Sequence, residues 1–283
     1  MNIRLAFLLL LSLIAHVLLA DPRQTTIMPY TGILHYVDSS TKDRAHVTGL
    51  YAAYGDGRLN LFECAFERLS ITRIGLPVYS QWDTTACYTI YPSAEWRFRL
   101  GAHFLYGDDW ASDSGHTFFF GGHTIRPRGW NTGWDAYISQ YPTARPTLAV
   151  LQATPHIGYT MPLSVNSSLC TDIKSYAIYP GDIPTIHRRT YFSLEGTISA
   201  EWRRWKYSAF YWDGRQLFAV RNDGFTVYNV AEAHLAGGGL SISHTLFSMT
   251  SVVLQANYDR WIDVLSNRRA YSTTLMAMIT TRL

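Results

Sequence analysis

The sequence predicts an all-β protein, a single transmembrane antiparallel up-and-down β-barrel of about fourteen strands, with 12–16 as the possible range. First, apolar and polar residues alternate with period two through most of the chain after Arg23. Second, the alternating segments are longer than the five or six residues of an average soluble strand. Third, tight turns and longer polar loops follow one another in alternation, as in a meander of antiparallel strands.

The alternation is clearest in two segments. Between 96 and 106, apolar residues such as Phe98 and Leu100 alternate with polar positions such as Arg97 and Arg99, and residues 191–202 repeat the pattern. Successive side chains of a strand point to opposite faces, whereas a helix would need apolar residues three and four apart. The predicted strands are 26–37, 45–55, 58–71, 78–91, 95–107, 115–126, 132–141, 147–160, 169–179, 189–202, 206–220, 225–243, 246–262 and 270–282.

The connections between these strands fall into two classes. Tight joints are predicted at 55–57, 91–94, 162–168, 203–205 and 243–245, and more polar loops at 38–44, 107–114, 179–188 and 263–269. No repeat, low-complexity stretch or linker interrupts the series. Residues 21–283 are therefore predicted to form one domain.

The amino end predicts export. One positive charge at Arg4 precedes an almost wholly apolar run over 5–20, and Asp21-Pro22-Arg23 ends it. This is the pattern of a secretory signal peptide over residues 1–20, cleaved after Ala20. The alternative is a membrane anchor, but the run is shorter than the roughly 20 residues that a helical span needs.

Composition excludes two other classes of protein. Of the 283 residues, 47% are hydrophobic and 16% charged, and the formal net charge is +3 at pH 7. The chain is too apolar to be disordered and too weakly charged to bind nucleic acid. Globular domains carry about 25% charged residues. The low charged fraction predicts that something other than water covers part of the surface.

Two architectures could use the alternating pattern, a soluble barrel or sandwich with an apolar interior and a membrane barrel with an apolar exterior. Aromatic residues favour the membrane barrel, because they stand at both ends of predicted strands: Trp96 and Tyr106 on one, Tyr191 (or Phe192) and Trp202 on another. Trp and Tyr prefer the membrane–water interface, where the ring is in lipid and its polar atom reaches water.

The polar faces of the same strands predict the lining of the barrel interior. Charges of both signs within long strands are costly unless they meet water or each other. The candidates are Glu63, Glu67, Asp83, Arg97, Arg99, His103, Asp135, Glu195, Glu201, Glu232, His234 and Asp259. Two readings stay open: these residues line a solute path, or they pair into a structural network.

With a signal peptide, amphipathic strands, alternating turns and loops, and a carboxyl-terminal strand, the chain from Asp21 to Leu283 resembles a Gram-negative outer-membrane β-barrel protein of the porin-like type. In the last strand, Tyr271, Leu275 and Ile279 belong to one mainly apolar face, while Leu283 stands where the family usually has Phe or Trp. The resemblance implies the outer membrane as location and membrane lipid, lipopolysaccharide and the barrel-assembly machinery as partners.

The leading functional prediction is a porin-like channel for small polar solutes, since fourteen strands enclose more room than side chains fill in an eight-stranded barrel. The alternatives are a closed barrel that binds a surface partner or scaffolds the envelope, a secreted soluble β-protein and an outer-membrane lipid hydrolase. Ser114-Gly115-His116-Thr117 is the nearest catalytic candidate, without an acidic residue at a defined spacing. We predict no catalytic residue, metal site or cofactor, and leave the oligomeric state open.

Overall fold

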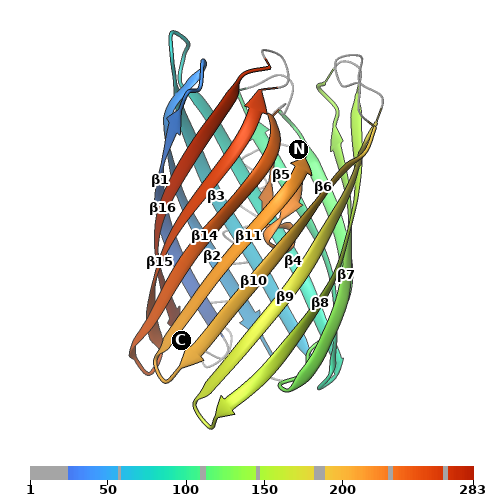
Figure 1. Cartoon of the computed structure of the whole chain (residues 1–283), viewed down its shortest axis with the longest axis vertical. Coiled ribbons are helices and arrows are strands. Elements are labelled where there is room, and N and C mark those ends of the chain that lie inside the picture. The colour runs from blue at the N-terminus through green and yellow to red at the C-terminus, as the bar shows by residue number, and fades with distance from the viewer. Residues whose placement is uncertain are drawn as a thin grey trace.

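The computed structural model describes residues 25–56, 59–108, 113–144, 147–181, 189–228, 232–263 and 267–283. Fourteen strands form one closed antiparallel barrel, in which each strand pairs with its sequence neighbours and β1 pairs with β16 (Figure 1). The wall strands are β1 (Thr25–Val37), β2 (Lys42–Gly55), β3 (Asn60–Arg73), β4 (Tyr79–Ser93), β5 (Trp96–Gly107), β6 (His116–Thr124), β7 (Gly129–Tyr141), β8 (Leu148–Ser164), β9 (Ser167–Pro180), β10 (Tyr191–Trp202), β11 (Trp205–Gln216), β14 (Glu232–Phe247), β15 (Thr250–Asp263) and β16 (Arg269–Arg282).

This architecture confirms the predicted fold class. At the seam, β1 pairs with β16 through Thr26, Ile27 and Tyr30–Val37, and the N–H of Leu283 donates to the carbonyl of Thr25 at 2.9 Å. Closure leaves no exposed sheet edge, so the strands satisfy one another's backbone groups around the whole circumference. No helix among the described residues is long and apolar enough to cross a membrane.

The two ends of the barrel differ, as the sequence predicts. Two-residue turns at 94–95, 165–166, 203–204 and 248–249 lie at the end where β1 begins and β16 finishes, and longer connections lie at the other end. One predicted turn was wrong: β14 does not end at 243–245 but stays paired with β15 as far as Phe247. The glycines at 237–239 do not shorten the strand, because each remains in register with a residue of β11 and of β15.

The outward face of the wall is apolar. Leucines on different strands are more than half exposed, with Leu100 at 62%, Leu240 at 64% and Leu254 at 59%. A water-soluble protein rarely exposes an apolar surface that runs around its circumference, whereas a membrane barrel presents one to lipid. At the end with the short turns, Trp96, Trp130, Trp202 and Trp205 are all exposed.

One segment departs from the predicted strands. The sequence predicts strands over 206–220 and 225–243, but residues 217–228 leave the wall and fold inside the barrel. We call this segment the inward hairpin. It contains two short paired strands, β12 (Val220–Arg221) and β13 (Thr226–Val227), joined by the 3-10 turn η2 (Asn222–Gly224).

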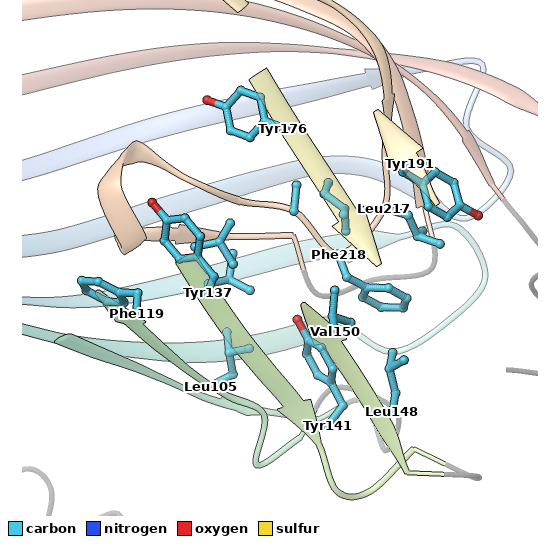
Figure 2. Packing of buried hydrophobic residues seen from close by; sticks show 14 of the residues in the cluster. Leu105, Phe119, Tyr137, Tyr141, Leu148, Val150, Tyr176, Tyr191, Leu217 and Phe218 are labelled. Atoms are coloured by element: carbon cyan, nitrogen blue, oxygen red, sulfur yellow. The ribbon is translucent and has the colours of Figure 1, made fainter. Parts of the chain in front are cut away.

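The inward hairpin completes an apolar core on one side of the barrel interior. Leu217, Ala219 and Val220 are at most 1% exposed and belong to a cluster with buried residues of the wall. Figure 2 shows Phe218 beside Val150 and Tyr141, and the rings of Phe218 and Tyr141 lie 5.3 Å apart. The interior is therefore filled against β5–β10, and the space that remains lies on the opposite side.

Candidate functional site in the barrel lumen

Ion pairs hold the turn of the inward hairpin against the wall. The Asp223 carboxylate accepts from Arg99 Nη1 at 3.1 Å and from Lys174 Nζ at 3.4 Å, and the Asp223 carbonyl accepts from Arg99 Nη2 at 2.6 Å. The next residue, Gly224, has a φ of +93°, and a Cβ atom there would stand 2.5 Å from the ring of Phe119. The turn thus needs glycine to approach the wall this closely.

Two further contacts fix the strands of the hairpin. Gln152 accepts from the N–H of Val220 at 2.9 Å and donates to its carbonyl at 2.6 Å, so one side chain satisfies both backbone groups. Arg221 pairs with Glu195, and its guanidinium lies 5.1 Å from the ring centroid of Trp212. Since these partners come from β8, β10 and β11, the hairpin is anchored on several strands at once.

A cavity of about 810 Å³ remains beside the inward hairpin. Its lining extends from Tyr36 and Lys42, near the loop end of β1 and β2, to Met28 and Met278 near the turn end of β1 and β16. The wall of the cavity consists mainly of β1–β4 and β14–β16, and the hairpin forms its other side. This space is large enough to hold a small solute.

Three carboxylates on neighbouring strands line this cavity without a cationic hydrogen-bond partner. Glu63 accepts from the Tyr51 hydroxyl at 2.7 Å, and Glu67 accepts from the Tyr30 hydroxyl at 2.9 Å. Asp83 lies opposite Glu67 in the register of β3 and β4. We call Glu63, Glu67 and Asp83 the acidic row.

The structure places the predicted lumen residues in three environments. Nine of them line the cavity: Glu63, Glu67, Asp83, Arg97, Arg99, Glu195, Glu232, His234 and Asp259. His103 and Asp135 are buried in the interior, at 1% and 4% exposed. Glu201 lies near the end of β10, where its side chain is 55% exposed and its carboxylate pairs with Lys206 at 2.9 Å. That residue does not face the cavity, because its strand ends there.

One of the predicted interface aromatics is misplaced. Tyr191 is 5% exposed and belongs to the interior cluster, while its neighbour Phe192 is 51% exposed on the outer face. The alternation of β10 explains this, because Tyr191 shares the inner face with Ser193 and Glu195, while Phe192 shares the outer face with Leu194. The outward side chains of Trp96 and Trp202 are 43% and 57% exposed, and Tyr106 shares the outward face of β5 with Trp96.

A chain of four titratable groups crosses the wall on β6–β9. His123 contacts Asp135 through Nε2 at 3.0 Å and His156 through Nδ1 at 2.7 Å, and His156 contacts Asp172 through Nδ1 at 3.0 Å. These side-chain contacts link four neighbouring wall strands in one polar network.

The hydrolase candidate lacks its expected contact. His116 faces the Ser114 backbone carbonyl at 3.3 Å and Gln140 at 3.2 Å, and the Ser114 hydroxyl donates instead to Asp113 at 3.3 Å. Nucleophilic catalysis would need the histidine to hydrogen bond with the hydroxyl. Within the described ranges, no group of three or more His, Cys, Asp or Glu residues is placed to hold a metal ion.

Sequence reasoning missed the residues that hold the inward hairpin, namely Gln152, Lys174, Arg221 and Asp223. The available signal was Asn222-Asp223-Gly224, a turn sequence between two short apolar runs, which is the pattern of a β-hairpin. The partners across the lumen carry no such local signal, since contact between them depends on barrel closure.

The comparisons with known proteins rest on structure alone, since neither a protein-family model nor a curated protein matches the sequence. A bacterial polysaccharide outer membrane secretin superposes with a TM-score of 0.57 at 7% identity, covering 93% of this chain and 100% of that one. The Pseudomonas putida toluene transporter TodX gives 0.53 at 6% identity, covering 93% and 92%. The NanC porin gives 0.51 at 8% identity, covering 90% and 100%.

The superpositions establish the architecture. Sequence identities this low do not identify the solute. The neighbours are outer-membrane β-barrels, and their strands match this chain over nine-tenths of its length. The chain has the closed, up-and-down β-barrel fold of outer-membrane porins and channels.

Proposed function

We propose that the protein is an outer-membrane channel for small polar solutes, with its path beside the inward hairpin along β1–β4 and β14–β16. The observation that carries the proposal is the cavity of about 810 Å³ that extends along this wall from the loop end to the turn end. Charged and hydroxyl side chains line it, as expected where hydrated solutes replace part of their water shell.

The proposal includes a location and an orientation. The apolar outer face contacts outer-membrane lipid, and the exposed tryptophans at the turn end lie at one interface. By the usual layout of such barrels, the short turns face the periplasm and the longer loops face outward towards lipopolysaccharide. Export by residues 1–20 and recognition of β16 by the barrel-assembly machinery belong to the same proposal, although residues 1–20 lie outside the described residues.

Single-channel recording in planar bilayers tests the channel function. The purified, refolded protein should insert and give discrete current steps in potassium chloride. Vesicles that contain it should also swell when small sugars are supplied outside. Sealed bilayers and unswollen vesicles, with a barrel shown by circular dichroism to be folded, would contradict the proposal.

A specific observation supports one alternative, a closed barrel that serves as a surface receptor or scaffold. The inward hairpin and its apolar cluster fill the interior against β5–β10, and Lys42 and Glu232 form an ion pair at 2.5 Å near the loop end of the cavity. The same recordings distinguish the two functions, because a receptor with a closed lumen conducts no ions.

A further inference from the structure

We propose that the path beside the inward hairpin prefers cationic solutes, and that Glu63, Glu67 and Asp83 determine this preference. The inference rests on the proposed channel function. It follows from the charges that line the cavity, once those that neutralise each other are set aside.

Most of the cations of the cavity form ion pairs with nearby carboxylates. Lys42 pairs with Glu232, and Arg221 pairs with Glu195. Arg99 and Lys174 share Asp223, so this group keeps one net positive charge. Among the ion pairs of the described residues, Arg97 is the one cavity-lining cation that takes part in none.

The acidic row has neutral hydrogen-bond donors by contrast. Tyr51 and Tyr30 donate to Glu63 and Glu67, and Gln81 Nε2 donates to both oxygens of Asp83 at 2.8 and 2.9 Å. These donors orient the carboxylates without forming an ion pair with them. Over the whole lining, seven carboxylates stand against five Lys and Arg side chains, so the formal charge of the cavity is negative and the acidic row is a part of it without an ion-pair partner from Lys or Arg among the described residues.

An independent observation points the same way at Asp83. His103 is 1% exposed, and its Nδ1 lies 2.7 Å from the Thr85 hydroxyl. Its Nε2 lies 4.0 Å from Asp83 Oδ1, beyond hydrogen-bond distance. His103 therefore does not hydrogen bond with Asp83, and the Asp83 side chain lines the cavity.

The rest of the lining indicates which cations fit. Leu34, Met28, Met276 and Met278 line the same cavity as the acidic row. Apolar walls lower the local dielectric constant and strengthen the field of nearby charges. A small organic solute with a charged nitrogen and a short apolar portion would use both surfaces, so we take butylammonium as the probe and butyrate as its anionic counterpart.

The size of the effect follows from Coulomb's law. One unit charge about 8 Å from the path in water changes the local concentration of a monovalent ion by roughly twofold. The Debye length is about 10 Å at 0.1 M salt, so the effect persists at that concentration. Seven carboxylates against five Lys and Arg side chains leave a formal charge of −2 on the lining, which should give a potassium-to-chloride permeability ratio above about 5.

The experiment measures reversal potentials under a potassium chloride gradient. The variant Glu63→Gln/Glu67→Gln/Asp83→Asn keeps side-chain size and hydrogen-bond acceptors but removes three charges. Its permeability ratio should fall to about 1 or below, and its permeability to butylammonium relative to butyrate should fall with it. Arg97→Gln should raise the ratio. The matched control Lys42→Met/Glu232→Gln removes an ion pair from the same cavity without changing the net charge, and should leave the ratio unchanged.

The outcomes separate the two proposals. A conducting wild-type barrel with no cation preference, or a folded triple variant with an unchanged ratio, would overturn this inference and leave the channel function standing. A folded wild-type barrel that conducts nothing would overturn the channel function and this inference with it. If the triple variant does not fold, the wild-type ratio and the Arg97→Gln variant still decide the matter.

Discussion

Asp223 is the residue on which the docking of the inward hairpin depends most directly. Its carboxylate is the shared partner of Arg99 and Lys174, and the Arg99 side chain is only 5% exposed. Removal of the Asp223 carboxylate leaves the buried Arg99 guanidinium with no counterion, which strongly destabilises the docked hairpin. The two cations come from β5 and β9, so a single carboxylate connects distant parts of the wall.

The pH dependence of this docking has a definite sign. Burial raises the pKa of Asp223, but the positive charges of Lys174 and Arg99 outweigh it and hold the pKa below its ordinary value of 3.8. A lowered pKa in the docked state means that ionisation stabilises docking. This contribution is complete above about pH 4 and is lost as the pH falls through the lower, docked value.

We therefore expect channel currents to be steady from pH 7 to pH 5 and to become larger and noisier only below about pH 4. Asp223→Asn should show the larger, noisier currents already at pH 7. Glu201→Gln, at an exposed ion pair of similar chemistry, serves as the control and should resemble the wild type. Steady currents from the Asn variant at neutral pH would show that Asp223 does not hold the hairpin.

Among the elements, the inward hairpin is the one that period-two alternation could not locate. Apolar residues on either side of Asn222-Asp223-Gly224 continue the β pattern of β11 and β14, so they were assigned to those strands. A short hairpin and the end of a long strand share the same local sequence pattern. What separates them is contact with Gln152 and Glu195, which lie tens of residues earlier in the chain.

Phe218 gives a test at the scale of this element. Phe218→Ala removes the ring that packs on Tyr141, and a buried Phe-to-Ala change typically costs 3–5 kcal/mol. The cost falls on hairpin docking and not on the pairing of the wall strands. We expect a larger conductance with an unchanged unfolding midpoint of the barrel in urea.

The matched control is Phe120→Ala, which also removes a phenyl ring, but from the outer face of β6, where the side chain is 44% exposed. Its conductance should equal that of the wild type. If both variants conduct alike, the hairpin does not limit the path.

At the scale of the whole molecule, closure should give the protein the properties of a membrane barrel. In unheated detergent samples it should migrate faster on a gel than after boiling, because the closed barrel resists unfolding. It should fractionate with the outer membrane and require detergent for extraction, since its circumference is apolar. Recovery as a detergent-free monomer would contradict this prediction.

The sequence allowed the wall to be predicted well, because strand length, alternation and turn spacing are all local features. Positions such as Glu63 and Arg97 could be assigned to the inner face from parity alone, that is, from their place in the period-two alternation of the strand. Parity could not reveal that Arg99 would be neutralised by the hairpin while Glu67 would not, since that depends on which residues meet across the lumen. The placement of Tyr191 in the interior, by contrast, follows from the local alternation, because Tyr191 shares its face with Ser193 and Glu195.

The position of the inward hairpin in the chain also bears on how the barrel is assembled. Four of its polar anchors on the wall, Arg99, Gln152, Lys174 and Glu195, precede it in sequence, while Asp259 of β15, which accepts from the Tyr228 hydroxyl at 3.4 Å, follows it. The four earlier anchors are therefore available before β14–β16 have been added. The interior against β5–β10 can be packed while the sheet is still open, as in an ordinary soluble domain. The last three strands then join β1 and enclose the empty half, so the order of the chain separates the building of a solid core from the building of a pore.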